Sequence, residues 1–130
     1  FSVRYGVGGK NVIDSFRGIV VKDLIAAGTA EADITFTKEE MMRIYEQMKK
    51  INVWEKKNLI KDTGCRTIPY SEDIWRIRMN GMEKTIQWSG EYCEVTKDAK
   101  QLIDLRNFVL DMVKRKEEYQ ALPEPEGAYE

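Results

Sequence analysis

Hydrophobic and polar residues alternate over positions 1–7, which is the pattern of a strand with one buried face. The segment 8–11 (GGKN) has a turn composition and ends this strand. The β-branched stretch 16–21 is predicted to return as a second strand, with Asp14 and Ser15 in the connection. A short third strand is predicted over 32–36, because Ile34 and Phe36 share a face.

Two amphipathic helices follow from capping residues and helical spacing. Thr37 and Glu40 are placed for a capping box, and Thr96, with Asp98 in the first turn, begins the second helix. The apolar stripe of the first helix is Met41, Ile44, Tyr45, Met48 and Ile51. The stripe of the second is Leu102, Leu105, Phe108, Val109, Met112 and Val113, and the prolines at 123 and 125 end that helix.

Between the helices, Asn80-Gly81 predicts a two-residue hairpin turn, because both residues tolerate positive φ. Such a turn fixes the strand register. The predicted pairs are Met79 with Met82, Arg78 with Glu83, Ile77 with Lys84, and Trp75 with Ile86. One face of the hairpin then carries the predicted core residues Trp75, Ile77, Met79, Met82, Ile86 and Trp88.

These elements predict an α+β fold with an antiparallel sheet of about five strands, formed by two hairpins and a short strand and packed against two amphipathic helices. We expect one domain over residues 1–130. It includes a mobile loop at 55–72, where charges, Gly64 and Pro69 break the periodicity, and an extended tail at 121–130.

Composition agrees with a single globular domain: of 130 residues, 42% are hydrophobic and 33% charged. The net charge of -1 and the mixing of both signs argue against a nucleic-acid partner. No apolar run reaches the ~20 residues that span a bilayer. Because the chain begins at Phe1, already in a strand pattern, we interpret it as the remainder of a longer precursor, and a missing N-terminal anchor would be its only link to a membrane.

The sequence contains no histidine, which excludes imidazole catalysis and most zinc sites. The glycine cluster at 6–9 lacks the Lys-Ser/Thr of a phosphate loop. We therefore predict no catalytic residues, no metal ligands and no cofactor. Carboxylates are abundant, so a hydrolase that uses a pair of them stays open.

Cysteine and aromatic residues supply the remaining candidates. Cys65 and Cys93 are compatible with one disulfide or with two free thiols. Trp54, Tyr70 and Tyr92 gather around the loop and the hairpin, where exposed aromatic rings would bind a protein, a peptide or a glycan. The alternative interpretation is that these rings are buried.

Four segments, YGVGGKNVIDSF, ITFTKEEMMRIYEQMKKI, NGMEKTIQW and KEEYQALPEPEGAY, resemble a family of small, uncharacterised bacterial proteins. Many of its members are similar to cell-envelope lipoproteins of Gram-positive bacteria. The resemblance covers most of the chain except 55–72, and it implies a cellular location rather than an activity. No lipid-anchoring cysteine is present near residue 1.

The first functional hypothesis is accordingly a non-enzymatic, extracytoplasmic interaction domain of the cell envelope. Two alternatives are a carboxylate-dependent hydrolase of envelope polymers and a cytoplasmic inhibitor or immunity-type protein.

Overall fold

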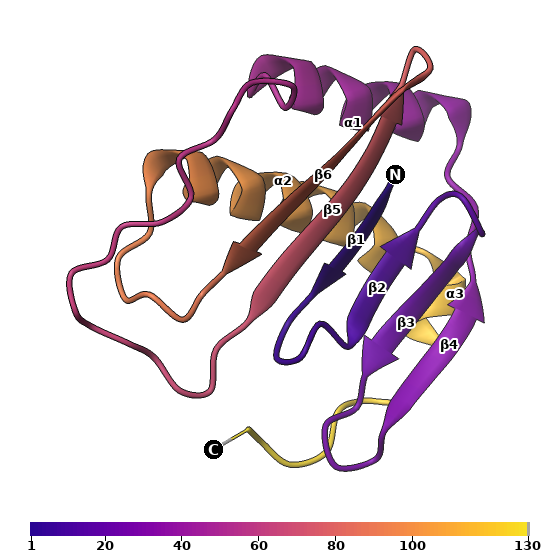
Figure 1. The fold of residues 1–130 in the computed structure, drawn as a ribbon. Coiled ribbons are helices and arrows are strands. Elements are labelled where there is room, and N and C mark those ends of the chain that lie inside the picture. Colours follow the sequence, from indigo (N-terminus) through magenta and orange to yellow (C-terminus); the bar gives the residue numbers. More distant parts are fainter. Residues whose placement is uncertain (130) are drawn as a thin grey trace.

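Six antiparallel strands form one sheet in the computed structural model, which describes residues 1–129 (Figure 1). The strands are β1 (Ser2–Tyr5), β2 (Asn11–Asp14), β3 (Ile19–Asp23), β4 (Thr29–Asp33), β5 (Glu72–Met79) and β6 (Met82–Ser89). Their order across the sheet is β4-β3-β2-β1-β5-β6, so β1 brings the two halves of the chain together. The predicted α+β class is confirmed, with six strands rather than about five.

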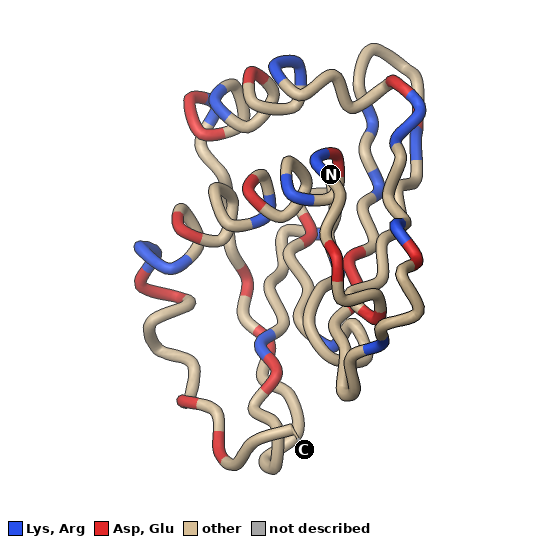
Figure 2. Tube along the Cα trace, turned by 90° about the vertical axis from the view of Figure 1, so that its left-hand side faces the viewer, with Lys and Arg blue, Asp and Glu red and all other residues tan. Residues whose placement is uncertain are grey.

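Helices α1 (Lys38–Lys50) and α2 (Lys97–Lys114) cover one face of this sheet, and the short α3 (Glu117–Gln120) follows α2. Figure 2 shows the helices on one side and the strands on the other, with charges of both signs spread along the chain. The core lies between the two layers and includes Val3, Ile13, Val20, Ile44, Trp75, Leu105 and Val109. The other face of the sheet carries no helix.

Local chemistry produced the predicted helix starts. Thr37 Oγ1 accepts the Glu40 N–H at 3.1 Å, and Glu40 Oε1 accepts the Thr37 N–H at 2.8 Å, which completes the capping box. Thr96 Oγ1 accepts the Ala99 N–H at 3.1 Å. Both helices therefore begin after the threonines that the sequence indicated.

The predicted register of the β5–β6 hairpin is also confirmed, with Met79 opposite Met82 and Trp75 opposite Ile86. Asn80 and Gly81 have φ of 52° and 78°, as the two-residue turn requires. The prediction for Met82 was wrong, because this side chain is 55% exposed. It lies beside the turn at the tip of the hairpin.

The N-terminal half differs from the prediction. Residues 11–14 form strand β2, whereas the prediction placed Asn11 in a turn and Asp14 in a connection. Gly8 and Gly9, with φ of 69° and 63°, reverse the chain within a few residues, so pairing with β1 resumes at Asn11. Asp14 then accepts the N–H groups of Phe16 and Arg17 and stabilises the next turn. As a result β3 begins at Ile19, and the strand predicted over 32–36 lies at Thr29–Asp33.

The segment between α1 and β5 contains no helix or strand and runs from the end of α1 past the start of α2 (Figure 1). The mobility of residues 55–72 stays a prediction.

The C-terminal tail lies against the turn of the β3–β4 hairpin. The Ala26 N–H donates to the Glu126 carbonyl, and the Glu126 N–H donates to the Leu24 carbonyl. Residue 130, the last of the predicted tail, lies outside the described residues. No helix within residues 1–129 combines the length and the apolar character needed to cross a membrane.

Candidate functional site

Strand β6 ends the sheet and pairs only with β5 among the described residues. In a two-residue hairpin the pair next to the turn, Met79 and Met82, is a hydrogen-bonded pair, and such pairs recur at every second position. The N–H and C=O groups of Glu83, Thr85 and Gln87 therefore point away from β5. Within residues 1–129, no backbone hydrogen bond reaches them from another segment. The strand offers an open edge.

Two adjoining pockets of about 400 and 530 Å³ lie along this edge. Both are lined by Lys57, Leu59 and Gln87, so we treat them as one channel and call it the edge groove. Strand β6 forms one wall over residues 84–89, and the segment 54–60 forms the other. The apolar part of the lining consists of Trp54, Leu59, Ile60, Ile86 and Trp88.

The start of α2 holds the wall that faces β6. The Asn58 N–H donates to Asp98 Oδ2 at 2.8 Å, and the Thr96 hydroxyl donates to the Asn58 carbonyl at 2.7 Å. The same Thr96 oxygen accepts the Ala99 N–H. The residues that begin the helix therefore also fix the position of the groove wall, because they bind both the backbone N–H and the backbone C=O of Asn58.

The edge groove is positively charged. Lys56, Lys57 and Lys84 line it, and no carboxylate does. Lys57 Nζ donates to the Ile51 carbonyl at 2.7 Å, and Lys84 Nζ donates to the Glu55 carbonyl at 2.8 Å across the groove. Burial lowers the pKa of Lys84, the positive charge of Lys57 lowers it further, and the carboxylate of nearby Glu55 opposes part of this shift. An anionic group in the groove would relieve this repulsion.

The structure separates the three predicted binding residues. Trp54 lines one part of the groove and Tyr92 the other, and both are half-buried. Tyr70 is also half-buried but does not line the groove. The Tyr92 ring lies under the guanidinium of Arg66, whose Cζ is 4.4 Å from the ring centre.

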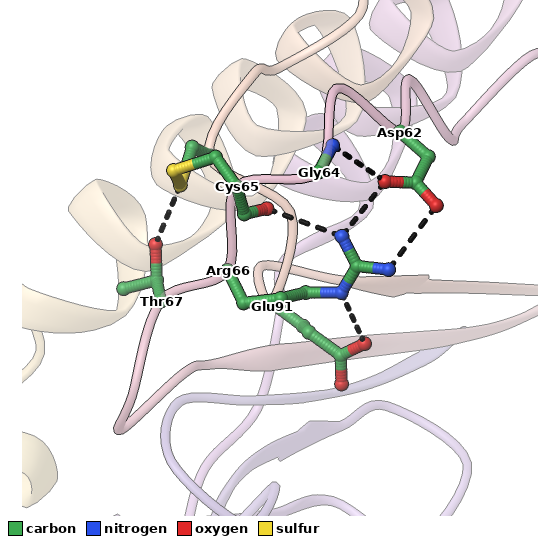
Figure 3. Close-up of a disulfide and its surroundings, with 7 residues drawn as sticks. Asp62, Gly64, Cys65, Arg66, Thr67 and Glu91 are labelled. Atoms are coloured by element: carbon green, nitrogen blue, oxygen red, sulfur yellow. Dashed lines mark hydrogen bonds and ion pairs between the residues drawn. A yellow bond between two sulfur atoms is a disulfide. The ribbon is translucent and has the colours of Figure 1, made fainter.

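Cys65 and Cys93 form a disulfide that fastens the long loop to the connection between β6 and α2 (Figure 3). Arg66 strengthens this junction, because it donates to both carboxylate oxygens of Asp62, at 2.8 and 3.1 Å, and lies 3.4 Å from a carboxylate oxygen of Glu91. The Thr67 N–H donates to the Glu91 carbonyl at 2.7 Å. The loop is therefore held at its middle by the disulfide and near its start by Asn58.

The lysines and Leu59 of the groove were not among the predicted binding residues. A signal for Lys84 was present in the predicted register, which places this charged residue opposite Ile77 on the core face of the hairpin. An inward-facing lysine on an edge strand discourages pairing with a neutral strand. No such signal exists for Leu59, because its position depends on the path of an irregular segment.

The chain matches no family model, and comparisons with curated proteins and with solved structures also give no match. The resemblance to envelope lipoproteins therefore stays a hypothesis. Among residues 1–129 there is no group of three or more Cys, Asp or Glu side chains that could hold a metal ion.

Proposed function

We propose that this chain is a non-enzymatic, extracytoplasmic binding domain, and that it takes an extended acidic segment of a partner protein as a seventh strand along β6. The observation that carries the proposal is the unpaired edge of β6 beside the edge groove. The outward N–H and C=O groups of Glu83, Thr85 and Gln87 can form main-chain hydrogen bonds, which give affinity for an added strand without regard to its sequence.

The lining of the edge groove would select among such segments. In an added strand, alternate side chains point to opposite faces, so every second residue of the partner would enter the groove. There it would meet the Lys57 and Lys84 amines together with the apolar surface of Leu59 and Trp88. The lysines attract an acidic strand and repel a basic one, and a neutral strand would cost them hydration without supplying a counter-charge, so the groove also selects against other partners.

The disulfide supports the extracytoplasmic part of the proposal. Cys65 and Cys93 are both exposed, and exposed disulfides persist mainly in oxidising compartments. The envelope anchor belongs to the same proposal and rests on the resemblance described above.

The alternative of a carboxylate hydrolase gains less support. Its mechanism needs two carboxyl groups that face each other across a cleft at ~5–9.5 Å. Of five pockets on the described part of the chain, one between α1 and α2 is lined by Asp104 and one on the open face of the sheet by Asp14, and neither contains a second carboxylate. The other three pockets have none.

A peptide of four Glu-Val repeats is a suitable probe, with a peptide of four Lys-Val repeats as its charge-reversed control. Isothermal titration should give a dissociation constant on the order of 10–100 μM for the acidic peptide and no measurable binding of the basic one. Methylation of alternate backbone nitrogens of the acidic peptide should abolish binding, because it removes the donors of one edge.

Gln87→Pro tests the edge itself. Its backbone nitrogen points away from β5, so proline removes an outward donor without removing a bond of the β5–β6 ladder. We expect affinity for the acidic peptide to fall about tenfold or more, whereas Gln87→Ala, which keeps the N–H, should bind like the unchanged chain. Equal binding by Gln87→Pro, with circular dichroism showing an intact fold, would refute strand addition.

A further inference from the structure

The open face of the sheet carries an arginine-rich pocket of about 250 Å³ on the three central strands. Ser2 lies between Asp14 and Arg76 in the strand register, and Arg4 lies between Val12 and Ile74. All six side chains project from the face opposite the helices, because Val3, between Ser2 and Arg4, points into the core. Arg17 reaches the pocket from the β2–β3 turn.

The donors around this pocket have bonding capacity to spare. Among the described residues, neither Arg4 nor the Ser2 hydroxyl has an ion pair or a side-chain hydrogen-bond partner, although Ser2 is only 8% exposed. Arg17 binds Asp14 through Nε alone, at 2.8 Å, and leaves its two terminal nitrogens free of contacts in the described part of the chain. Arg76 uses one nitrogen, which lies 3.0 Å from Glu83.

Positive charge exceeds negative charge at this place. Three arginines line the pocket, and Asp14 is the single carboxylate in its lining. Asp14 already accepts two backbone N–H groups and the Arg17 Nε–H, so it does not compete for Arg4 or Arg76. Glu72 projects from the same face two residues before Ile74, but it forms no ion pair with Arg4 within residues 1–129. The lining therefore has a formal excess of about two positive charges, which Glu83 beside Arg76 offsets in part.

We propose that this pocket binds a small dianionic oxyanion group, either a phosphate monoester or a compact dicarboxylate. Guanidinium groups match both ligands, because their planar pairs of N–H donors form two parallel bonds to oxyanions. Arg4 and Arg76 are diagonal neighbours on adjacent strands, ~7–8 Å apart, which is within the reach of long side chains, so their guanidinium groups can converge on one ligand above Ser2. The Ser2 hydroxyl then donates from the floor of the pocket, and Val12 and Ile74 exclude water from one side.

The site is distinct from the edge groove. It lies on β1, β2 and β5, whereas the groove is formed by β6 and the segment 54–60. Loss of strand addition would leave this proposal intact, and Arg4→Gln should leave binding of the acidic peptide to the groove intact.

Titration with inorganic phosphate and with malonate, each at constant ionic strength, tests the site by ¹H–¹⁵N spectra that include the arginine Nε–H signals. We expect saturable shifts confined to residues 2–4, 12–17 and 74–76, with a dissociation constant of about 1–10 mM for the preferred anion. The tighter of the two anions identifies the ligand chemistry. Shifts that do not saturate, or that spread over the whole surface, would overturn the proposal.

Matched variants distinguish specific binding of the anion in this pocket from non-specific electrostatic attraction. Arg4→Gln should weaken binding at least about fivefold, and Arg4→Lys should recover only part of this loss, because a lysine keeps the charge but not the paired donors. Arg43→Gln on α1 removes the same charge from the helical layer, where Arg43 pairs with Glu39, and should change nothing. Equal effects of Arg4→Gln and Arg43→Gln would overturn the proposal.

Discussion

Arg106 of α2 donates from one terminal nitrogen to both carboxylate oxygens of Asp73 in β5, at 2.6 and 2.8 Å. The Asp73 side chain is 1% exposed and that of Arg106 is 17% exposed, so the pair lies between the sheet and the helix. Burial raises the pKa of Asp73, and the charge of Arg106 opposes part of that shift. The guanidinium also lies 5.5 Å from the centre of the Tyr5 ring, which ties α2 to β1 as well.

Arg106→Met should destabilise the fold by about 3–5 kcal/mol, because it leaves the Asp73 carboxylate buried without a counter-charge. Urea denaturation at neutral pH measures this loss. Lys100→Met on the same helix is the control, since the pair of Lys100 with Asp104 is exposed and should contribute below about 1 kcal/mol. The double variant Asp73→Leu with Arg106→Met should recover much of the stability. A loss for Arg106→Met no larger than the control would show that the pair is energetically neutral.

Removal of the disulfide should destabilise the chain by about 3–4 kcal/mol in the loop-entropy account, since the two cysteines are 28 residues apart. The double variant Cys65→Ser with Cys93→Ser removes the covalent link and keeps Arg66 with its carboxylate partners, and a serine hydroxyl replaces the Cys93 sulfur beside Thr67 Oγ1. Thermal unfolding with and without a reducing agent gives the comparison. The reducing agent should lower the melting temperature of the unchanged chain and leave that of the double variant unaffected.

The elements predicted correctly from the sequence are those that neighbouring residues specify. Thr37 with Glu40, and Thr96 with Ala99, satisfy the first turns of their own helices, and Asn80-Gly81 sets the register of a hairpin through its own dihedral angles. Strand β2 was missed because the glycines before it read as the end of a strand, whereas they form a tight turn inside a meander.

The sites depend on contacts that no local pattern records. Asp73 and Arg106 are 33 residues apart, and Asn58 and Thr96 are 38 apart. The pocket above Ser2 exists because β1 pairs with β5, a pairing across about 70 residues that places Arg76 beside Ser2. Trp54 and Tyr92, which line the edge groove, were candidates from the sequence because aromatic side chains are informative by themselves. Single lysines and arginines do not indicate a binding site in the sequence, because only the fold brings them together.

Stability should decrease as the pH falls below about 4.5, in part through Glu40. Burial by itself raises the pKa of this carboxyl, but hydrogen bonds from the Lys116 ammonium, at 2.8 Å, and from the Thr37 N–H outweigh burial and hold the pKa below its ordinary 4.5. Because the folded-state pKa is lowered, the contribution is complete above 4.5 and is lost as the pH falls through the folded value.

Lys116→Met tests this contribution through its pH dependence, because methionine removes both the charge beside Glu40 and the contact of the ammonium with the Phe36 ring, and only the first of these depends on the protonation of Glu40. We expect it to cost about 1 kcal/mol at pH 7 and less at pH 3, because the ion pair weakens as Glu40 takes up a proton. Urea midpoints at the two pH values provide the measurement. A difference between the two proteins that stays constant with pH would contradict the role of Glu40.

The two helix caps should differ in their effect on binding. Thr37→Ala and Thr96→Ala each remove one side-chain cap and should each cost about 1 kcal/mol of stability. Thr96→Ala also releases the Asn58 carbonyl from the wall of the edge groove, so it should lower affinity for the acidic Glu-Val peptide, whereas Thr37→Ala should not. Thr96→Ser restores the hydroxyl and should restore both properties. Equal losses of affinity in the two alanine variants would show that affinity follows global stability rather than the position of Asn58.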